Sequence, residues 1–175
     1  MRSPDCALLP GFFLKPGEIF IGSGPAVVTT ILGSCVGIVF FNRQRPMGAI
    51  CHALLPGGPE KDQGGKYVDS VIPLILREYA KKGIERREIE VKLFGGSDMF
   101  APSGVANSLA IGRQNIHKAL ALIEAEGLRL IASDVGGEGS RKLKFFVHSG
   151  EVLLKRQHKP PQDHPSSFIF PETRK

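Results

Sequence analysis

At 175 residues, with 42% hydrophobic and 23% charged residues, the chain has the size and composition of one globular domain. No apolar run approaches the roughly 18 residues that a membrane-crossing helix needs. The net charge of +6 does not by itself indicate nucleic-acid binding, because Lys and Arg are scattered and no basic patch is interleaved with aromatic residues.

The first 18 residues predict a loosely held N-terminal arm, because Pro10-Gly11 and Pro16-Gly17 interrupt any regular element. Pro and Asp also break the apolar core that a signal peptide would need, so we expect a cytoplasmic protein. Two strands are predicted next, at 18–22 and at 26–32.

The stretch 29–52, TTILGSCVGIVFFNRQRPMGAICH, predicts a strand, a turn of small residues and a hairpin. If the hairpin folds symmetrically about Arg43-Gln44, Cys35 lies opposite His52, with Cβ atoms roughly 4.5–5.5 Å apart. A histidine beside a cysteine can accept its proton and leave the reactive thiolate. The alternative is that Cys35 is a buried hydrophobic residue, which is the commoner role of a single cysteine in a strand.

The turn before Cys35 adds a second feature of a catalytic site. Gly33 lets the backbone bend and lets a substrate approach closely. The amide of Cys35 and its neighbours can then stabilise an oxyanion. Thr29 and Thr30 are the candidates for orienting the imidazole. Ser34 is a weaker candidate nucleophile, because no G-x-S-x-G elbow surrounds it.

A polar loop and two helices are predicted after the hairpin. The loop, 54–66, lacks apolar periodicity and is expected to lie exposed near the site. The helices, at 69–82 and 112–126, are predicted from apolar residues at helical spacing. A strand at 89–94 lies between them and ends at Gly95-Gly96, where the next segment can come close.

The last part of the chain predicts strands at 128–133, 143–148 and 152–157. The glycine-rich segment 134–142 lies between the first two. A dinucleotide-binding fingerprint would need a helix after the glycines, so we interpret this segment as a hairpin. With about eight strands and two helices, joined mostly by hairpins, the chain predicts an α+β domain and not a doubly wound parallel sheet.

Three segments are expected along the chain: the arm 1–18, a folded domain 19–157, and a Pro-rich, flexible tail 158–175. The triplet Phe168-Ile169-Phe170 is an exception within the tail, because three apolar residues in a polar segment often dock onto another surface.

The three cysteines, at positions 6, 35 and 51, do not predict a disulfide framework in a reducing compartment. The sequence also lacks the C-x-x-C pairs of structural zinc sites. A zinc site built from Cys35, His52 and the distant His148 is therefore a disfavoured alternative.

Several blocks of the sequence resemble one known family. LGSCVGIVFFN, GAICHALLP, KLFGGSDMF, IGRQN and DVGGEGSRKLKF are similar, in this order, to blocks of the CheD family of bacterial chemotaxis proteins, the chemoreceptor glutamine deamidases. The resemblance extends from about residue 19 to residue 155. No single block is specific, but the set is.

The resemblance implies a catalytic triad at defined positions. Cys35 would be the nucleophile and His52, seventeen residues later, the base. Thr29, six residues before the cysteine, would complete the triad, although Thr30 beside it allows a shift of one. Only one of the two threonines can share the face of the thiol. Cys51 would point away from the site and pack in the core.

The resemblance also implies a fold and an activity. The fold would be two mixed sheets packed face to face with helices outside, similar to the catalytic domain of cytotoxic necrotizing factor. The activity would be deamidation of glutamines in methyl-accepting chemotaxis receptors through a thioester, with backbone amides of the turn at Gly33 and Ser34 holding the oxyanion and with no metal or cofactor. Arg141, Lys142 and Lys144 would form a solvated strand face or dock onto the receptor coiled coil.

Two alternative functions remain open. The first is a binding module that regulates a CheC-type phosphatase by occupying it, with or without deamidase activity. The second is hydrolysis of receptor glutamyl methyl esters by the same thiolate.

Overall fold

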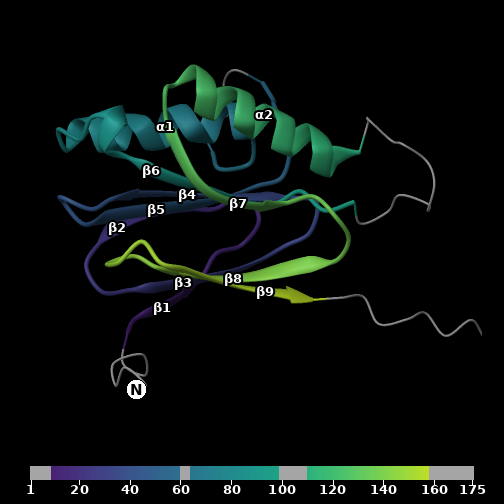
Figure 1. The fold of residues 1–175 in the computed structure, drawn as a ribbon, viewed down its shortest axis with the longest axis horizontal. Coiled ribbons are helices and arrows are strands. Elements are labelled where there is room, and N and C mark those ends of the chain that lie inside the picture. Colours follow the sequence, from purple (N-terminus) through teal and green to yellow (C-terminus); the bar gives the residue numbers. More distant parts are fainter. Residues whose placement is uncertain (1–8, 60–63, 99–109, 158–175) are drawn as a thin grey trace, which may run out of the picture.

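The computed structural model describes residues 9–59, 64–98 and 110–157, and these form three layers. A five-stranded sheet lies between two helices on one side and a four-stranded sheet on the other (Figure 1). Each sheet contains one parallel strand pair, so both are mixed. The predicted α+β fold with face-to-face mixed sheets and outer helices is confirmed.

The five-stranded sheet contains the predicted hairpin at its centre. Its strands are ordered β2-β5-β4-β6-β7. Every residue of β4 and β5 is buried, because this sheet is covered on both faces. The bounds are β2 (Ile19–Ser23), β4 (Val36–Asn42), β5 (Met47–Ala53), β6 (Glu90–Gly95) and β7 (Arg129–Val135).

The two helices cover the outer face of this sheet. They are α1 (Val68–Lys81) and α2 (Ile111–Ala125), and a short 3₁₀ helix (Arg86–Glu88) precedes β6. The helix α1 packs through a stripe of buried residues at the predicted helical spacing, including Val71, Ile75 and Tyr79. Neither of the described helices has the length and apolar character needed to cross a bilayer.

The four-stranded sheet, ordered β1-β3-β8-β9, is built from both ends of the described chain. Its strands are β1 (Gly11–Phe13), β3 (Val27–Leu32), β8 (Ser140–Phe146) and β9 (Val152–Gln157). Parallel pairing of β1 with β3 places residues 11–13 in the sheet, so this part of the predicted loose arm is ordered structure. Residues 1–8 and the tail 158–175, with its Phe168–Phe170 triplet, lie outside the described residues.

The glycine-rich segment is not a hairpin. It joins β7 in the five-stranded sheet to β8 in the four-stranded sheet, so the strands on either side of it belong to different layers. Gly136, Gly137 and Gly139 all have positive φ, which allows the sharp change of direction. The sequence indicated the turn correctly but not the change of sheet.

Two apolar cores result from this layering. The helix-side core lies between the helices and the five-stranded sheet and includes Ile38, Phe40 and Cys51. The inter-sheet core lies between the two sheets and includes Val39, Ile50 and Phe145. Adjacent residues of β4 and β5 enter different cores, because side chains alternate along a strand.

Candidate active site

The hairpin of β4 and β5 brings Cys35 and His52 to the same face of the sheet, but in a register that differs from the predicted one. His52 pairs with Gly37, and the last pair of the ladder is Val36 with Ala53. The turn therefore contains four residues, 43–46, and the pairing is shifted by two. A shift of two keeps every side chain on its predicted face. Cys35 becomes a diagonal neighbour of His52. In a regular antiparallel ladder, diagonal neighbours lie roughly 7–8 Å apart.

Cys35 lies one residue before β4 and packs against the inter-sheet core. Its side chain is partly exposed. Burial raises the pKa of the Cys35 thiol above its usual value, and the nearby amide of Cys35 itself partly offsets this effect. Within the described part of the chain the thiol makes no hydrogen bond to the imidazole of His52. The resting thiol is therefore protonated at neutral pH.

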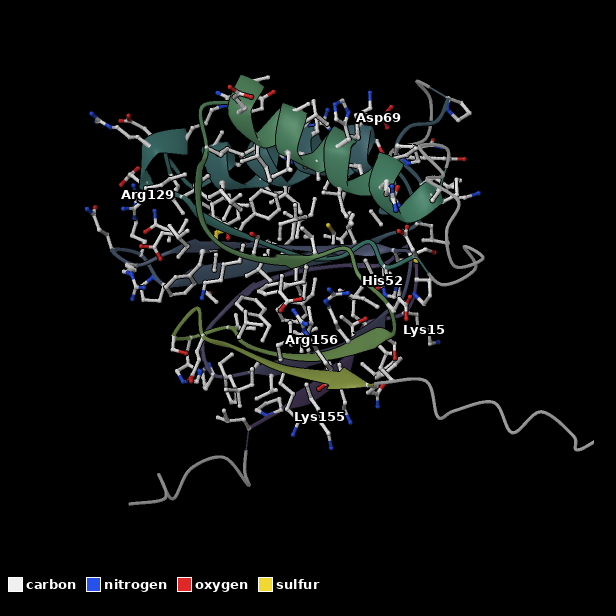
Figure 2. The ribbon with its side chains drawn as sticks, turned by 45° about the vertical axis from the view of Figure 1, so that its right-hand side comes forward. Lys15, His52, Asp69, Arg129, Lys155 and Arg156 are labelled. Carbon is white, nitrogen blue, oxygen red and sulfur yellow. The ribbon has the colours of Figure 1, made fainter. Side chains whose placement is uncertain are left out.

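His52 is almost completely buried between the two sheets, with 3% of its surface exposed. Figure 2 shows it at one end of the inter-sheet layer. Its Nδ1 atom lies 2.8 Å from Oγ1 of Thr30. Burial lowers the pKa of His52, and a contact with the Leu14 carbonyl partly offsets this. The imidazole is therefore neutral at pH 7.

The hydrogen bonds around Thr30 fix which nitrogen of His52 carries the proton. The Thr30 hydroxyl donates to the carbonyl of Leu14, at 2.8 Å. Because a hydroxyl has one proton and a carbonyl can only accept, Thr30 must accept the second bond from Nδ1–H of His52. The neutral ring therefore has its lone pair on Nε2, which is the nitrogen available as a base.

The threonine that contacts the imidazole is Thr30, not Thr29. Thr30 is fully buried and faces the other sheet. Thr29 lies on the outer face of the four-stranded sheet, beside Phe13 and Lys144. Of the two threonines that the sequence left open, only Thr30 shares the face of the imidazole, because adjacent strand residues point to opposite faces. The catalytic role of either threonine stays a prediction.

A segment that sequence reasoning missed holds the backbone of His52. The amide of Gly17 donates to the His52 carbonyl at 2.8 Å, and the His52 amide donates to the Glu18 carbonyl at 3.1 Å. The Leu14 amide in turn donates to the Thr29 carbonyl. Residues 14–18 thus fix both the main chain of the histidine and, through Leu14 and Thr30, its ring.

The loop Gly33-Ser34-Cys35 is held by its carbonyl groups. The carbonyl of Gly33 accepts from the amide of Ser97, that of Ser34 from the side chain of Asn115, and that of Cys35 from the amide of Gly96. In a planar trans peptide the N–H of one residue points away from the carbonyl of the residue before it. The amides of Ser34 and Cys35 therefore point away from Ser97 and Asn115.

The two glycines after β6 are required for this close packing. Gly95 has a φ of +99°, and a Cβ there would overlap the carbonyl oxygen of Cys35. Gly96 has a φ of +66°, and a Cβ there would overlap Ile116 of α2. The predicted closeness of Gly95-Gly96 to the site is thus observed.

Arg141 is an internal residue and not part of a surface cluster. Only 3% of it is exposed, and its guanidinium donates to Asp134, to Ser97 and to the carbonyl of Gly136. This network ties the glycine-rich segment to Ser97, whose amide holds the Gly33 carbonyl. No local sequence pattern indicates this network, because its partners come from distant segments.

The other predicted residues lie away from the site. Cys51 is fully buried in the helix-side core, as predicted, and burial raises its pKa to about 12. The described residues contain no cluster of three or more His, Cys, Asp or Glu side chains, so Cys35, His52 and His148 do not converge. Cys6 lies outside the described residues.

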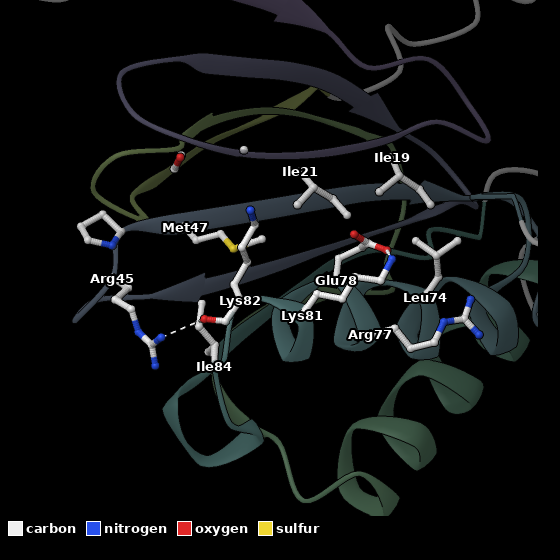
Figure 3. Close-up of a pocket in the computed structure, with 13 residues that line it drawn as sticks. Ile19, Ile21, Arg45, Met47, Leu74, Arg77, Glu78, Lys81, Lys82 and Ile84 are labelled. Carbon is white, nitrogen blue, oxygen red and sulfur yellow. Dashed lines mark hydrogen bonds and ion pairs between the residues drawn. The ribbon is translucent and has the colours of Figure 1, made fainter.

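A cavity of about 1100 Å³ lies elsewhere, between the edge strand β2 and α1. Figure 3 shows Ile19 and Ile21 of β2 facing Leu74 and Glu78 of α1 across it. Neither Cys35 nor His52 belongs to its lining. The candidate active site is therefore defined by its side-chain geometry and not by this cavity.

Comparison with known proteins gives a consistent result. A family model described as CheD chemotactic sensory transduction matches residues 54–156. The chain is 47% identical over 155 residues to a Geobacter sulfurreducens protein named probable chemoreceptor glutamine deamidase CheD 2, covering 89% of this chain and 95% of that protein. A Maridesulfovibrio salexigens protein named probable chemoreceptor glutamine deamidase CheD is 42% identical, over 84% of this chain and 92% of that protein. A Methanococcus vannielii protein of the same name is 33% identical, over 82% of this chain and 93% of that protein.

Proposed function

Because this chain belongs to the CheD family, we propose that it deamidates glutamine side chains of chemoreceptors, with Cys35 as nucleophile and His52 as base. The observation that carries the assignment of these residues is their common face between the two sheets, where Thr30 and Leu14 leave Nε2 of His52 unprotonated. The proposal rests on this arrangement and on the names of the relatives.

The first step is attack on the amide. Nε2 of His52 accepts the thiol proton of Cys35 while Sγ bonds to the carbon of the glutamine side-chain amide. Both groups are neutral at rest, since burial raises the pKa of Cys35 and lowers that of His52. The charge pair thus forms during attack, when substrate has displaced water, and not beforehand.

The amides of Ser34 and Cys35 are suited to hold the resulting oxyanion. Their carbonyl partners in the same peptide planes are bonded into the protein, so these N–H groups point the other way. Backbone donors already in place stabilise developing charge without reorganisation. Gly33 leaves the turn without a side chain at the approach.

Three proton transfers complete the reaction. The imidazolium gives its proton to the departing nitrogen, the C–N bond breaks, and ammonia leaves a thioester between Cys35 and the substrate. His52 then takes a proton from water as it attacks the thioester carbon. The C–S bond breaks, the imidazolium of His52 gives its proton to the departing sulfur of Cys35, and the product is a glutamate side chain.

The test is incubation of the full chain with a cytoplasmic fragment of a methyl-accepting chemotaxis receptor. We expect ammonia release and a mass gain of about one dalton for each converted amide, which follows from replacing NH₂ by OH. Methanol release in place of ammonia would indicate the methylesterase alternative. Absence of both products with an amide-bearing fragment would contradict the proposal.

Binding to a CheC-type phosphatase is a separate prediction. The variant Cys35→Ala keeps the surface of the protein but lacks the proposed nucleophile, so it distinguishes binding to the phosphatase from deamidation of receptors. Retained complex formation together with lost ammonia release would show both roles.

A cytoplasmic location is also part of this proposal, since Cys35 and Cys51 are free thiols.

A further inference from the structure

Asn115 of α2 connects the two parts of the candidate site. It is completely buried, and its Nδ2 donates to the Ser34 carbonyl at 3.0 Å and to the Leu54 carbonyl at 2.9 Å. Ser34 precedes the proposed nucleophile by one residue, and Leu54 follows the proposed base by two. An amide NH₂ group has two protons, so both are used.

These two bonds lie where the hairpin ladder ends. The last backbone pair of β4 and β5 is Val36 with Ala53, and the chains leave the ladder at Cys35 and Leu54. Beyond that point no ladder bond fixes their separation. The side chain of Asn115 joins the carbonyls on the two departing chains and so takes the place of the missing backbone bonds.

The separation at this point matters because the register leaves Cys35 diagonal to His52. The ladder holds Gly37, not Cys35, opposite the imidazole. The position of the thiol therefore depends on the loop outside the ladder. Of the three loop carbonyls, the middle one is held by a side chain, and that side chain also holds the strand of the base.

The oxygen of the Asn115 side-chain amide differs from its nitrogen in having no partner within the described part of the chain. Its Oδ1 atom is buried and has no hydrogen-bond partner among the described residues. An unpartnered buried acceptor is unfavourable for folding. The contacts of Asn115 with the rest of the described protein are therefore made by its two donors and not by Oδ1.

We propose that Asn115 is a positioning residue that sets the distance between the Cys35 thiol and the His52 imidazole. The inference rests on the proposed function, since it takes Cys35 and His52 as nucleophile and base. Asn115 acts through the backbones of Ser34 and Leu54 and does not touch the substrate. Loss of either bond would free the backbone that carries the thiol or the imidazole, and so change their separation.

The first measurement is the rate of Cys35 alkylation by iodoacetamide across pH 5 to 10, followed by peptide mapping, in the full chain. The variant Asn115→Leu keeps the approximate volume of the side chain but removes both donors. We expect it to lower the alkylation rate near neutral pH about tenfold, because displacement of a reacting group by about 1 Å can cost on the order of 10²-fold. Its pH profile should resemble that of His52→Gln.

The decisive comparison is a double-mutant cycle. If Asn115 acts by setting the thiol–imidazole distance, Asn115→Leu has little further effect once His52 is replaced by Gln. The same fold-change in the presence and absence of His52 would overturn the proposal, because it would show a general effect on the exposure of Cys35. Unchanged alkylation in Asn115→Leu alone would overturn it as well.

A matched control separates positioning from stability. Ile123→Ala removes a buried side chain of the same helix, two turns away from Asn115, and should lower Tm at least as much. We expect it to leave the alkylation profile unchanged. In deamidation assays Asn115→Leu should lower kcat about 10- to 100-fold with KM changed less than threefold. If the wild type shows no deamidation, the proposed function fails, while the alkylation cycle still tests Asn115.

Discussion

Cys51 and His52 are neighbours in β5, yet their side chains enter opposite layers of the molecule. Cys51 lies in the helix-side core among aliphatic side chains, and burial raises its pKa to about 12. His52 lies between the sheets and bonds to Thr30, which bonds to Leu14. Adjacent residues of one strand thus place a fully buried sulfur in one layer and the imidazole of the proposed base in the other.

The two layers differ in polarity in the same way as the surroundings of Cys51 and His52. Between the sheets, buried polar groups gather near the end that carries Cys35, namely Thr30, His52, Ser97 and Arg141. The helix-side core is apolar under α1, apart from Tyr79, whose hydroxyl lies within hydrogen-bond distance of the carbonyls of Phe40 and Met47 and can donate to either. We therefore expect stability to depend mainly on the helix-side core and the proposed chemistry on the layer between the sheets, so substitutions on the two faces of β5 should have different consequences.

The largest difference in activity is expected between variants of the two cysteines that the structure describes, Cys35 and Cys51. Cys35→Ala removes the proposed nucleophile and should lower deamidation by at least about 10³-fold, while leaving Tm nearly unchanged because the site is partly exposed. Ammonia release and thermal unfolding measure the two effects. Residual activity within tenfold of wild type would exclude the thioester mechanism.

Replacement of the proposed base should have the next largest effect. His52→Gln keeps a polar side chain but removes the proton acceptor, and general-base catalysis contributes about 10²–10⁴-fold. We expect a loss in kcat within that range, measured under saturating receptor fragment. If His52→Gln affected only KM, the imidazole would be a binding group and the division of roles between the faces would need revision.

The two threonines of β3 give a matched pair. Thr30→Val removes the hydroxyl that holds Nδ1 of His52, and loss of a group that orients a functional imidazole typically costs about 10- to 100-fold. Thr29→Val changes the outer face of the four-stranded sheet and should leave kcat within about twofold, as surface substitutions usually do. Equal losses in both variants would contradict the assignment of Thr30.

The buried imidazole should also make stability depend on pH. The pKa of His52 is lower in the folded chain than in the unfolded one, so the unfolded state binds more protons as pH falls below about 6.5. Stability from this group is therefore complete above that pH and is lost on acidification, by at most about 1.4 kcal/mol for each pH unit. Urea unfolding at pH 5, 6 and 7 measures the slope, which His52→Gln should reduce.

The smallest effect on activity is expected on the helix side. Cys51→Ala removes a buried sulfur and should lower the free energy of unfolding by about 1–2 kcal/mol, with kcat within twofold of wild type. Denaturant unfolding and the ammonia assay measure the two quantities. A large loss of kcat with little loss of stability would show that the two faces of β5 are not independent.

The sequence predicted the faces of the central hairpin better than its register. Alternation placed Cys35 and His52 on one side and Cys51 on the other, and this needed no knowledge of the turn. The register depended on turn length, and Arg43-Gln44-Arg45-Pro46 lacks the Asn-Gly or Asp-Gly pair that defines a two-residue turn. The four-residue turn therefore shifted the pairing by two without moving any side chain to the other face.

Non-local contacts were the part that sequence patterns did not predict. The parallel pair of β1 with β3 brings Leu14 to Thr30, sixteen residues away in the chain. Asn115 reaches Ser34 across 81 positions, and Arg141 reaches Ser97 across 44. Periodicity and turn composition describe neighbours along the chain, so polar residues whose partners come from other layers gave no local signal.

The oxygen that sets the protonation of His52 belongs to the main chain of Leu14. Every residue has such an oxygen, so replacing Leu14 by another amino acid leaves it present. Comparison of related sequences would therefore not reveal the part that the Leu14 carbonyl takes in the hydrogen bonds from His52 through Thr30. Selection would act instead on the spacing from Lys15 to Glu18 and on Gly17, whose φ of +83° shapes that bend.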